Sequence, residues 1–166
     1  LGNYDNRRFK AAVNVPIGDT LAVRLSYANI QQDGFIKNPG TGVKRWGDKD
    51  REAMRGDVLW EPSDRFSLRY SYDRSEIGDT PTYVAFSPLY PLKAERPKAG
   101  SPLVRDVLPN DVTSQGHSLI GEWRAADGLT IKSITAYRKL NNFQNQDYLT
   151  GVTGPNPLQK NSSLAK

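Results

Sequence analysis

Apolar and polar side chains alternate one by one along several segments of this chain. In residues 21–27 every second side chain is apolar, and Ala22, Arg24 and Ser26 occupy the positions between them. Residues 66–73 show the same alternation. A period of two places successive side chains on opposite faces of an extended strand, whereas an amphipathic helix needs a period of about 3.6. The chain is therefore predicted to form two-faced β-strands.

Four further segments extend this prediction to about six strands, which makes the expected fold class all-β. These segments are residues 8–15, 54–60, 115–125 and 129–142. The last two alternate less cleanly, because Ile120 and Ile134 fall at positions that otherwise hold polar side chains.

The connections between the expected strands alternate between short and long. Short turns rich in Pro, Gly, Asp and Ser are predicted near residues 16–20, 62–65 and 126–128. Long loops are predicted near residues 33–49, 77–114 and 143–166. In an antiparallel up-and-down meander this order places the short turns at one end and the long loops at the other. Transmembrane β-barrels have that asymmetry, with short periplasmic turns and long extracellular loops.

The composition is compatible with a transmembrane β-barrel and excludes a transmembrane helix. No run of about 18 apolar residues occurs, as a spanning helix would need. A barrel strand needs only about 9 to 11 residues, of which every second one is apolar. Because single-chain bacterial barrels begin at about eight strands, residues 1–166 are expected to be part of a larger barrel.

The aromatic residues fall near the two ends of the expected strands, on the apolar side of each. Such rings are expected to form the two interfacial girdles of a membrane barrel, at the depth of the lipid headgroups. The predicted girdle residues are Tyr27, Trp60, Phe66, Tyr70, Tyr72, Trp123 and Tyr137.

A soluble β-sandwich that acts as a binding module is the main structural alternative. It would bury Leu21, Val23, Leu25 and Phe66 against a second layer of structure. Long loops without structure of their own are uncommon in soluble domains, so the loop lengths favour the barrel. The net charge of +5 does not indicate a nucleic-acid partner, because the basic residues are scattered along the chain.

Several segments resemble, in order and spacing, the barrel of a TonB-dependent outer-membrane receptor. They are residues 23–27, 33–38, 55–64, 68–73 and 133–138. With the stretches around them, the resemblance covers about residues 1–147. It implies a barrel of about 22 strands closed by an N-terminal plug. It also implies active uptake of a scarce small molecule, such as a ferric siderophore, across the outer membrane of a Gram-negative cell. A passive outer-membrane channel shares every feature except these motifs and stays an alternative.

The same resemblance implies the partners of the protein. Outer-membrane lipid and lipopolysaccharide would surround the barrel, and TonB with ExbB and ExbD would supply energy through the plug. The plug and the segment that contacts TonB are expected in parts of the protein other than residues 1–166. No cofactor is expected.

No residue pattern indicates an enzyme or a metal site. His117 is the only histidine, no cysteine is present, and no nucleophile motif lies near His117, which we interpret as a polar residue at the membrane rim. Asp48, Asp50 and Glu52 lack the spacing of a calcium loop and are interpreted as a solvated loop base. Residues 40–42 contain two glycines but no phosphate-loop motif, so a turn is expected there.

The candidate ligand-binding residues lie in the long loops, where cationic and aromatic side chains could grip a ligand at the mouth of a barrel. They are Lys44, Arg45, Trp46, Tyr83, Phe86 and Tyr90. The alternative is that the aromatic residues pack the loops onto themselves. Arg24 and Arg69 are expected to face the lumen, where they would bind ligand or contact the plug, and the plug is favoured.

Overall fold

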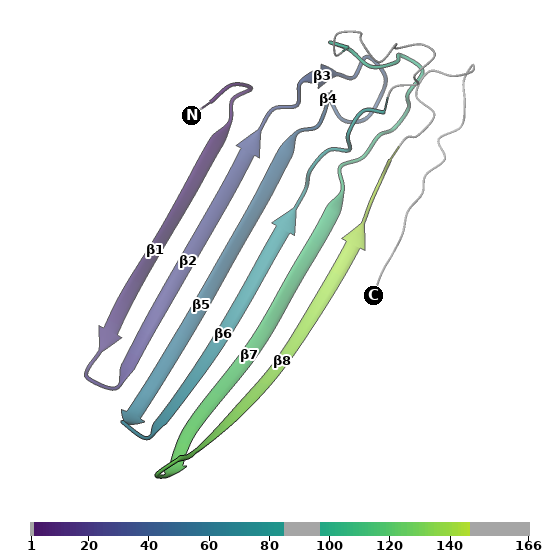
Figure 1. Ribbon diagram of the computed structural model, residues 1–166. Helices are drawn as coiled ribbons and strands as arrows, with labels where there is room; N and C mark the ends of the chain where they lie inside the picture. The colour runs from purple at the N-terminus through teal and green to yellow at the C-terminus, as the bar shows by residue number, and fades with distance from the viewer. Residues whose placement is uncertain (1, 85–96, 147–166) are drawn as a thin grey trace.

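The computed structural model describes residues 2–84 and 97–146, and it confirms that the fold is all-β. The main sheet consists of β1 (Arg7–Ile17), β2 (Leu21–Gln32), β5 (Lys49–Ser63), β6 (Phe66–Ile77), β7 (Asp111–Ala126) and β8 (Leu129–Phe143). These strands follow one another across the sheet in chain order, each antiparallel to the next, and the sheet is open (Figure 1). Two short strands, β3 (Ile36–Lys37) and β4 (Arg45–Trp46), pair separately.

The strands of the main sheet are long, with 11 residues in β1 and 16 in β7. Strands of globular proteins usually have about 3 to 10 residues. Two strands begin earlier than the alternation predicts, β5 at Lys49 and β7 at Asp111. The first residues of β5 are charged on both faces and those of β7 are mostly polar, but backbone hydrogen bonds to the neighbouring strands continue the ladder there.

Short and long connections lie at opposite ends of the sheet (Figure 1). The short turns occupy residues 18–20, 64–65 and 127–128. Gly18 and Gly128 have φ angles of 65° and 81°, a conformation that costs glycine nothing and strains other residues. The connections between β2 and β5 and between β6 and β7 both lie at the other end.

One face of the main sheet carries large apolar side chains on every strand, and we call it the apolar face. The register aligns them across the strands, for example Val15 with Val23, Val23 with Val58, and Val58 with Tyr70. Its large apolar members are Phe9, Val13, Val15, Ile17, Leu21, Val23, Leu25, Tyr27, Met54, Val58, Trp60, Phe66, Leu68, Tyr70, Tyr72, Leu119, Trp123, Ile131 and Tyr137.

No part of the described chain covers the apolar face. Leu25 is 56% exposed, Val13 51% and Trp123 50%, and none of the large side chains on this face is buried. The second layer that a β-sandwich would place against Leu21 and Val23 does not occur among residues 2–84 and 97–146. This much exposed apolar surface is typical of a face that contacts a partner or a membrane.

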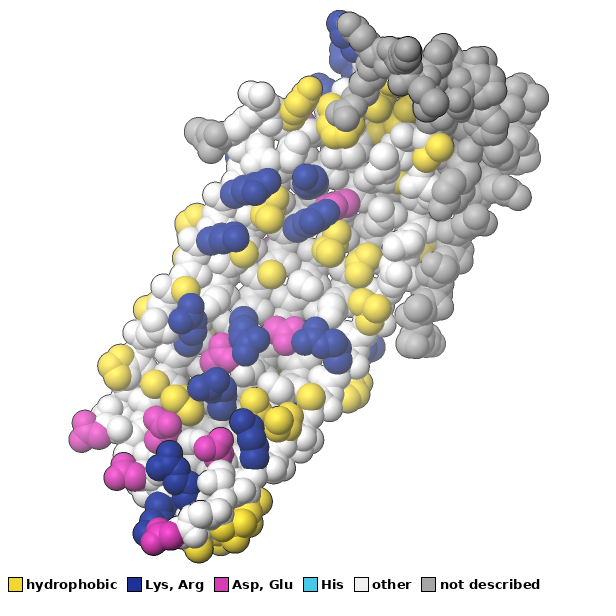
Figure 2. All heavy atoms as spheres, in the orientation of Figure 1, with side chains coloured by type: hydrophobic (Ala, Val, Ile, Leu, Met, Phe, Trp, Pro, Cys, Tyr) yellow, Lys and Arg dark blue, Asp and Glu magenta, His cyan; other side chains and the backbone are white. Residues whose placement is uncertain are grey.

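The opposite face, the polar face, carries most of the charged side chains of the strands. Figure 2 shows them spread along the sheet, with further charges at the short-turn end. The polar face includes Lys10, Asn14, Arg24, Ser26, Arg55, Asp57, Arg69, Ser71, Asp73 and Arg138. Ile120 and Ile134 are directly paired on this face, which explains why their segments alternate imperfectly.

The buried hydrophobic core of the described chain lies in the long connections and not on the sheet. Its members are Ile36, Trp46, Tyr83, Val104 and Val107. Residues 33–48, 78–84 and 97–110 form this assembly, which we call the loop unit. The longer loop contains no helix or strand in its described residues, but it supplies Tyr83, Val104 and Val107 to this core.

Backbone hydrogen bonds join the two long connections within the loop unit. Lys37 N donates to Lys98 O at 3.0 Å, and Val43 N donates to Val107 O at 2.9 Å. A Cβ on Gly40 would collide with the carbonyl of Val104, so a residue without a side chain allows the two chains to meet. These contacts make the two connections one folded unit at the long-loop rim.

Candidate functional site on the polar face

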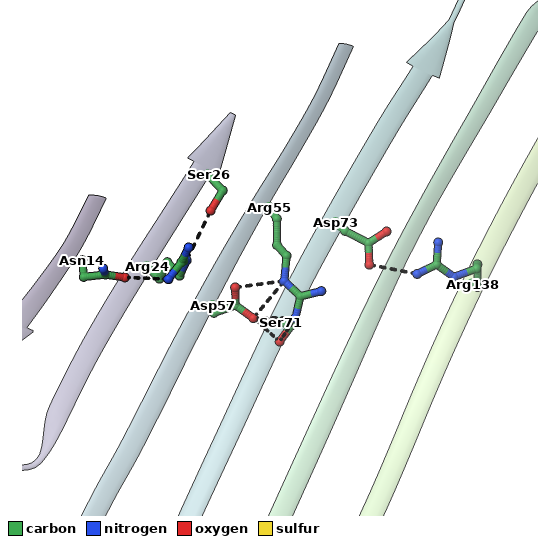
Figure 3. A network of polar contacts seen from close by, with 8 residues as sticks. All are labelled: Asn14, Arg24, Ser26, Arg55, Asp57, Ser71, Asp73 and Arg138. Carbon is green, nitrogen blue, oxygen red and sulfur yellow. Dashed lines mark hydrogen bonds and ion pairs between the residues drawn. The ribbon is translucent and has the colours of Figure 1, made fainter. Parts of the chain in front are cut away.

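A hydrogen-bonded cluster occupies the middle of the polar face on β5 and β6. Arg55 donates from Nε to Oδ2 of Asp57 at 2.9 Å and from Nη2 to Oδ1 at 2.7 Å. Ser71 donates to Oδ1 of Asp57 at 2.6 Å and accepts from Nη2 of Arg55 at 3.2 Å. Ser71 is 4% exposed, so the side chain that hydrogen-bonds to both Arg55 and Asp57 is buried (Figure 3).

A second ion pair crosses the whole width of β7. Nη2 of Arg138 on β8 lies 2.9 Å from Oδ1 of Asp73 on β6. The register places Gly116 between them, and a Cβ there would lie 3.2 Å from Cζ of Arg138. The missing side chain at Gly116 therefore lets Arg138 reach Asp73 over the intervening strand (Figure 3).

The β1–β2 half of the polar face is cationic and lacks carboxylates. Its positions are Arg8, Lys10, Ala12, Asn14 and Pro16 on β1, and Ala22, Arg24, Ser26, Ala28 and Ile30 on β2. Arg24 donates to Asn14 Oδ1 at 3.4 Å and to Ser26 Oγ at 3.5 Å, which are both neutral acceptors. The polar face of β5 and β6, in contrast, carries carboxylates such as Asp57 and Asp73 beside its cations.

A groove of about 630 Å³ lies at the border between these two halves. Small side chains line it, namely Ala12, Ser26, Ala28, Ala53 and Ser75. Lys10, Arg24, Arg55 and Asp73 also contribute to its wall. Because the small residues leave room and the cations outnumber Asp73, the groove can accept an anionic group such as a carboxylate.

Nearer the short turns, a row of three apolar side chains and one arginine crosses the polar face, and we call it the apolar row. The register aligns Leu59, Arg69, Ile120 and Ile134 in that order across β5 to β8. Ile134 is 66% exposed, the highest value among the exposed large hydrophobic residues of the described chain. Arg69 lies on the polar face as expected from the sequence, and so does Arg24. Exposed isoleucine on this face indicates a surface that packs against protein more readily than water.

The predicted ligand-binding residues of the loops have different environments. Trp46 is 0% exposed and Tyr83 is 8% exposed, with ring centroids 5.4 Å apart. For these two side chains the structure shows the packing alternative. Lys44 is exposed, and Arg45 is half-buried and donates to the carbonyl of Gly34 at 3.2 Å. Phe86 and Tyr90 lie outside the described residues, and ligand contact by Lys44 and Arg45 stays a prediction.

The base of the loop unit contains one electrostatically perturbed carboxylate. Burial raises the pKa of Asp48 above the ordinary value of 3.8, and the hydrogen bond from the Gly34 amide acts in the opposite direction. Asp33 raises this pKa further and Arg45 lowers it. Asp50 and Glu52 are exposed but lie within β5, and Asp48 is partly buried, so the interpretation of all three as a solvated loop base is not correct for Asp48.

The predicted girdle residues all lie on the apolar face. Trp60 and Phe66 are in contact near the short turns, with ring centroids 5.9 Å apart, and Phe66 pairs with Trp123 across the strands. Tyr27, Tyr70, Tyr72 and Tyr137 lie further along their strands, towards the long loops. His117 is exposed among these tyrosines, and its Nδ1 lies 2.7 Å from the hydroxyl of Tyr70.

Sequence reasoning missed most of the polar-face cluster. It singled out Arg24 and Arg69, but not Asp57, Asp73 or Arg138. The signal was present, because Arg55 and Asp57 are two residues apart and therefore share a strand face. The pairing of Asp73 with Arg138 depends on the register of three strands, which the alternation does not specify.

The described residues include no group of three or more His, Cys, Asp or Glu side chains placed to hold a metal ion. Across the same residues, no helix has the length and apolar character needed to cross a membrane. Comparisons of the chain with family models, curated proteins and solved structures give no match.

Proposed function

We propose that this chain is part of the β-barrel of an outer-membrane receptor of the TonB-dependent class, which takes up a scarce small molecule in a Gram-negative cell. The observation that carries the proposal is the division of the sheet into an exposed apolar face and a charged, hydrogen-bonded face. In a membrane barrel the apolar face contacts lipid, and the polar face lines the lumen. The residues have no catalytic role in this proposal.

Strand length and loop placement support the membrane assignment. Each main strand has at least the 11 residues of β1, which matches the about 9 to 11 residues that a tilted strand needs to cross the hydrocarbon. Both long connections lie at one rim, as extracellular loops do, and the short turns lie at the other. The two edges of the open sheet would pair with further strands of the barrel, since lipid offers no partner for unpaired backbone groups.

The apolar row on the polar face favours a plugged receptor over a passive channel. A water-filled lumen gains nothing from Ile134, Ile120 and Leu59, because apolar side chains are stabilised by removal from water. A plug domain inside the barrel would cover this row and would place Arg69 against protein. Because the row lies near the short turns, the proposal has this contact on the periplasmic side.

In this proposal the polar face has two roles. In the Arg55–Asp57–Ser71 cluster and the Asp73–Arg138 pair, each charged side chain is paired with one of opposite charge. These residues therefore stabilise the wall of the barrel. Lys10 and Arg24 line the groove and have no acidic partner on their half of the sheet, so they can attract an anionic solute along the groove. Lys44 at the rim carries the same sign of charge.

The decisive experiment uses the protein expressed from its full coding sequence in a Gram-negative host. Membranes are separated, and the purified protein is placed in a planar lipid bilayer to measure ion conductance. The periplasmic domain of TonB is then tested for binding to the same protein in detergent. A receptor stays in the outer-membrane fraction after urea extraction, gives no open-channel conductance and binds TonB.

The other results select the alternatives. Stepwise open conductance without TonB binding would identify a passive channel. Recovery of the protein in a soluble fraction would refute the membrane assignment and favour the soluble binding module.

A further inference from the structure

Two adjacent cross-strand rows lie where the apolar face ends towards the long loops. The aromatic row consists of Tyr72, His117 and Tyr137, which the register aligns on β6, β7 and β8. The donor row, one step nearer the long loops, consists of Arg74, Gln115 and Lys139. Both rows belong to the same face as Leu119 and Trp123.

The aromatic row is a packed but accessible surface. The ring of His117 lies 4.8 Å from the ring of Tyr72, and Tyr137 is 64% exposed. His117 is also exposed. Rings of this amphipathic kind prefer the boundary between hydrocarbon and water, at headgroup depth.

Every side chain of the donor row carries N–H groups, and none is a carboxylate. Arg74 forms an ion pair with Glu76, so its charge is partly neutralised within the protein. Lys139 is exposed and forms no ion pair with any described residue. Its aliphatic stem is long enough to follow the apolar surface while the ammonium reaches the polar region.

We propose that the two rows bind the phosphate group of a membrane lipid headgroup, with Lys139 as the main cation. This inference rests on the proposed function, because it requires acyl chains against the apolar face. Acyl chains packed against Leu119 would place the lipid headgroup at the aromatic row and its phosphate at the donor row. The ammonium of Lys139 and the amide of Gln115 then donate to phosphate oxygens, which accept several such bonds.

The charge distribution confines the site to β6, β7 and β8. On β5 the donor row continues as Met54, which has no charge, and the carboxylates of Glu52 on β5 and Glu76 on β6 lie one step nearer the long loops. On β2 the donor row continues as Tyr27, which has no charge. Lys139 therefore marks the side of the barrel where an anionic headgroup is favoured.

The test uses the protein from its full coding sequence in phosphatidylcholine vesicles that contain a small fraction of fluorescent lipid A. Lys139→Gln is expected to weaken lipid A binding about fivefold, the effect of removing one cation near an anionic surface. Lys139→Arg should keep the affinity, and added salt should narrow the difference. Lys132→Gln is the matched control, since Lys132 is on the same strand but on the polar face, 3.7 Å from Glu122.

Equal binding by the wild type and Lys139→Gln would overturn the lipid site, as would an equal loss in Lys132→Gln. In both cases the protein would still be inserted in the vesicles, so the proposed receptor function would stand. A protein that does not enter vesicles at all would overturn both the lipid site and the proposed function.

Discussion

The substitution Leu25→Arg probes the environment of the apolar face at its centre. On β2, Leu25 pairs with Val13 on β1, and apolar residues continue from Val13 to Phe9 in one direction and to Ile17 in the other. Leu25 therefore lies near the middle of the apolar band. If this face contacts lipid, an arginine at mid-depth should destabilise the barrel by about 2 to 4 kcal/mol.

The same substitution has a small effect if the face contacts water. Leu25 is 56% exposed, and exposed surface positions usually change stability by within about 0.5 kcal/mol. The assay is equilibrium urea unfolding of the vesicle-inserted protein from its full coding sequence, followed by tryptophan fluorescence. Two tryptophans, Trp60 and Trp123, lie on the apolar face and report on this transition.

Ser26→Arg is the control for the charge itself. Ser26 lies next to Leu25 at the same depth but on the polar face, where Arg24 already stands two residues away. It should cost less than about 1 kcal/mol, as exposed charge interactions do. The reasoning is refuted if Leu25→Arg stays within about 0.5 kcal/mol of the wild type, or if the two variants cost the same.

Three further predictions concern the loop unit and the polar face. Trp46→Ala should cost the loop unit about 3 to 5 kcal/mol, seen as faster protease cleavage of the loops while the unfolding of the sheet is unchanged. Asp48→Asn should make the loop unit more resistant to protease at pH 7. Because the folded pKa of Asp48 is raised, its ionisation opposes folding, so this advantage should fade as the pH falls through that raised pKa towards 3.8; a pH-independent difference would contradict it. Gly116→Val should displace Arg138 from Asp73, and its effect should vanish in a background where Arg138 is already glutamine, as a double-mutant cycle would measure.

The alternation of side chains predicted the two faces of the sheet, and the reason is local. A period of two fixes the face of every residue once one residue is placed, so Leu25 and Arg24 could be assigned without any tertiary information. The turns were equally accessible, because Gly18 and Gly128 lie where the backbone must adopt a positive φ.

The loop unit could not be predicted, because its structure is built from contacts between distant segments. Residues 37–43 pair with residues 98–107 through backbone groups, which carry no sequence signal. In the sequence, loop aromatic residues such as Trp46 and Tyr83 fit a ligand-binding surface and a small hydrophobic core equally well. Only the fold distinguishes the two, and it buries both rings.

The polar-face cluster lies between these cases. Arg55 and Asp57 are neighbours on one strand face, so their pairing could be predicted from the sequence. The Asp73–Arg138 pair was not, because it needs the register of β6, β7 and β8 together with the absence of a side chain at Gly116.

Nitroxide scanning along β2 tests most directly whether the apolar face contacts lipid. The chain contains no cysteine, so single cysteines at residues 21–28 can each carry a spin label in the vesicle-inserted protein from its full coding sequence. Labels at positions 21, 23, 25 and 27 should collide mainly with oxygen dissolved in lipid, and labels at 22, 24, 26 and 28 mainly with a water-soluble nickel reagent. Equal accessibility to the two reagents on both faces, or protection of positions 21, 23 and 25 from both reagents, would contradict a lipid-facing barrel wall.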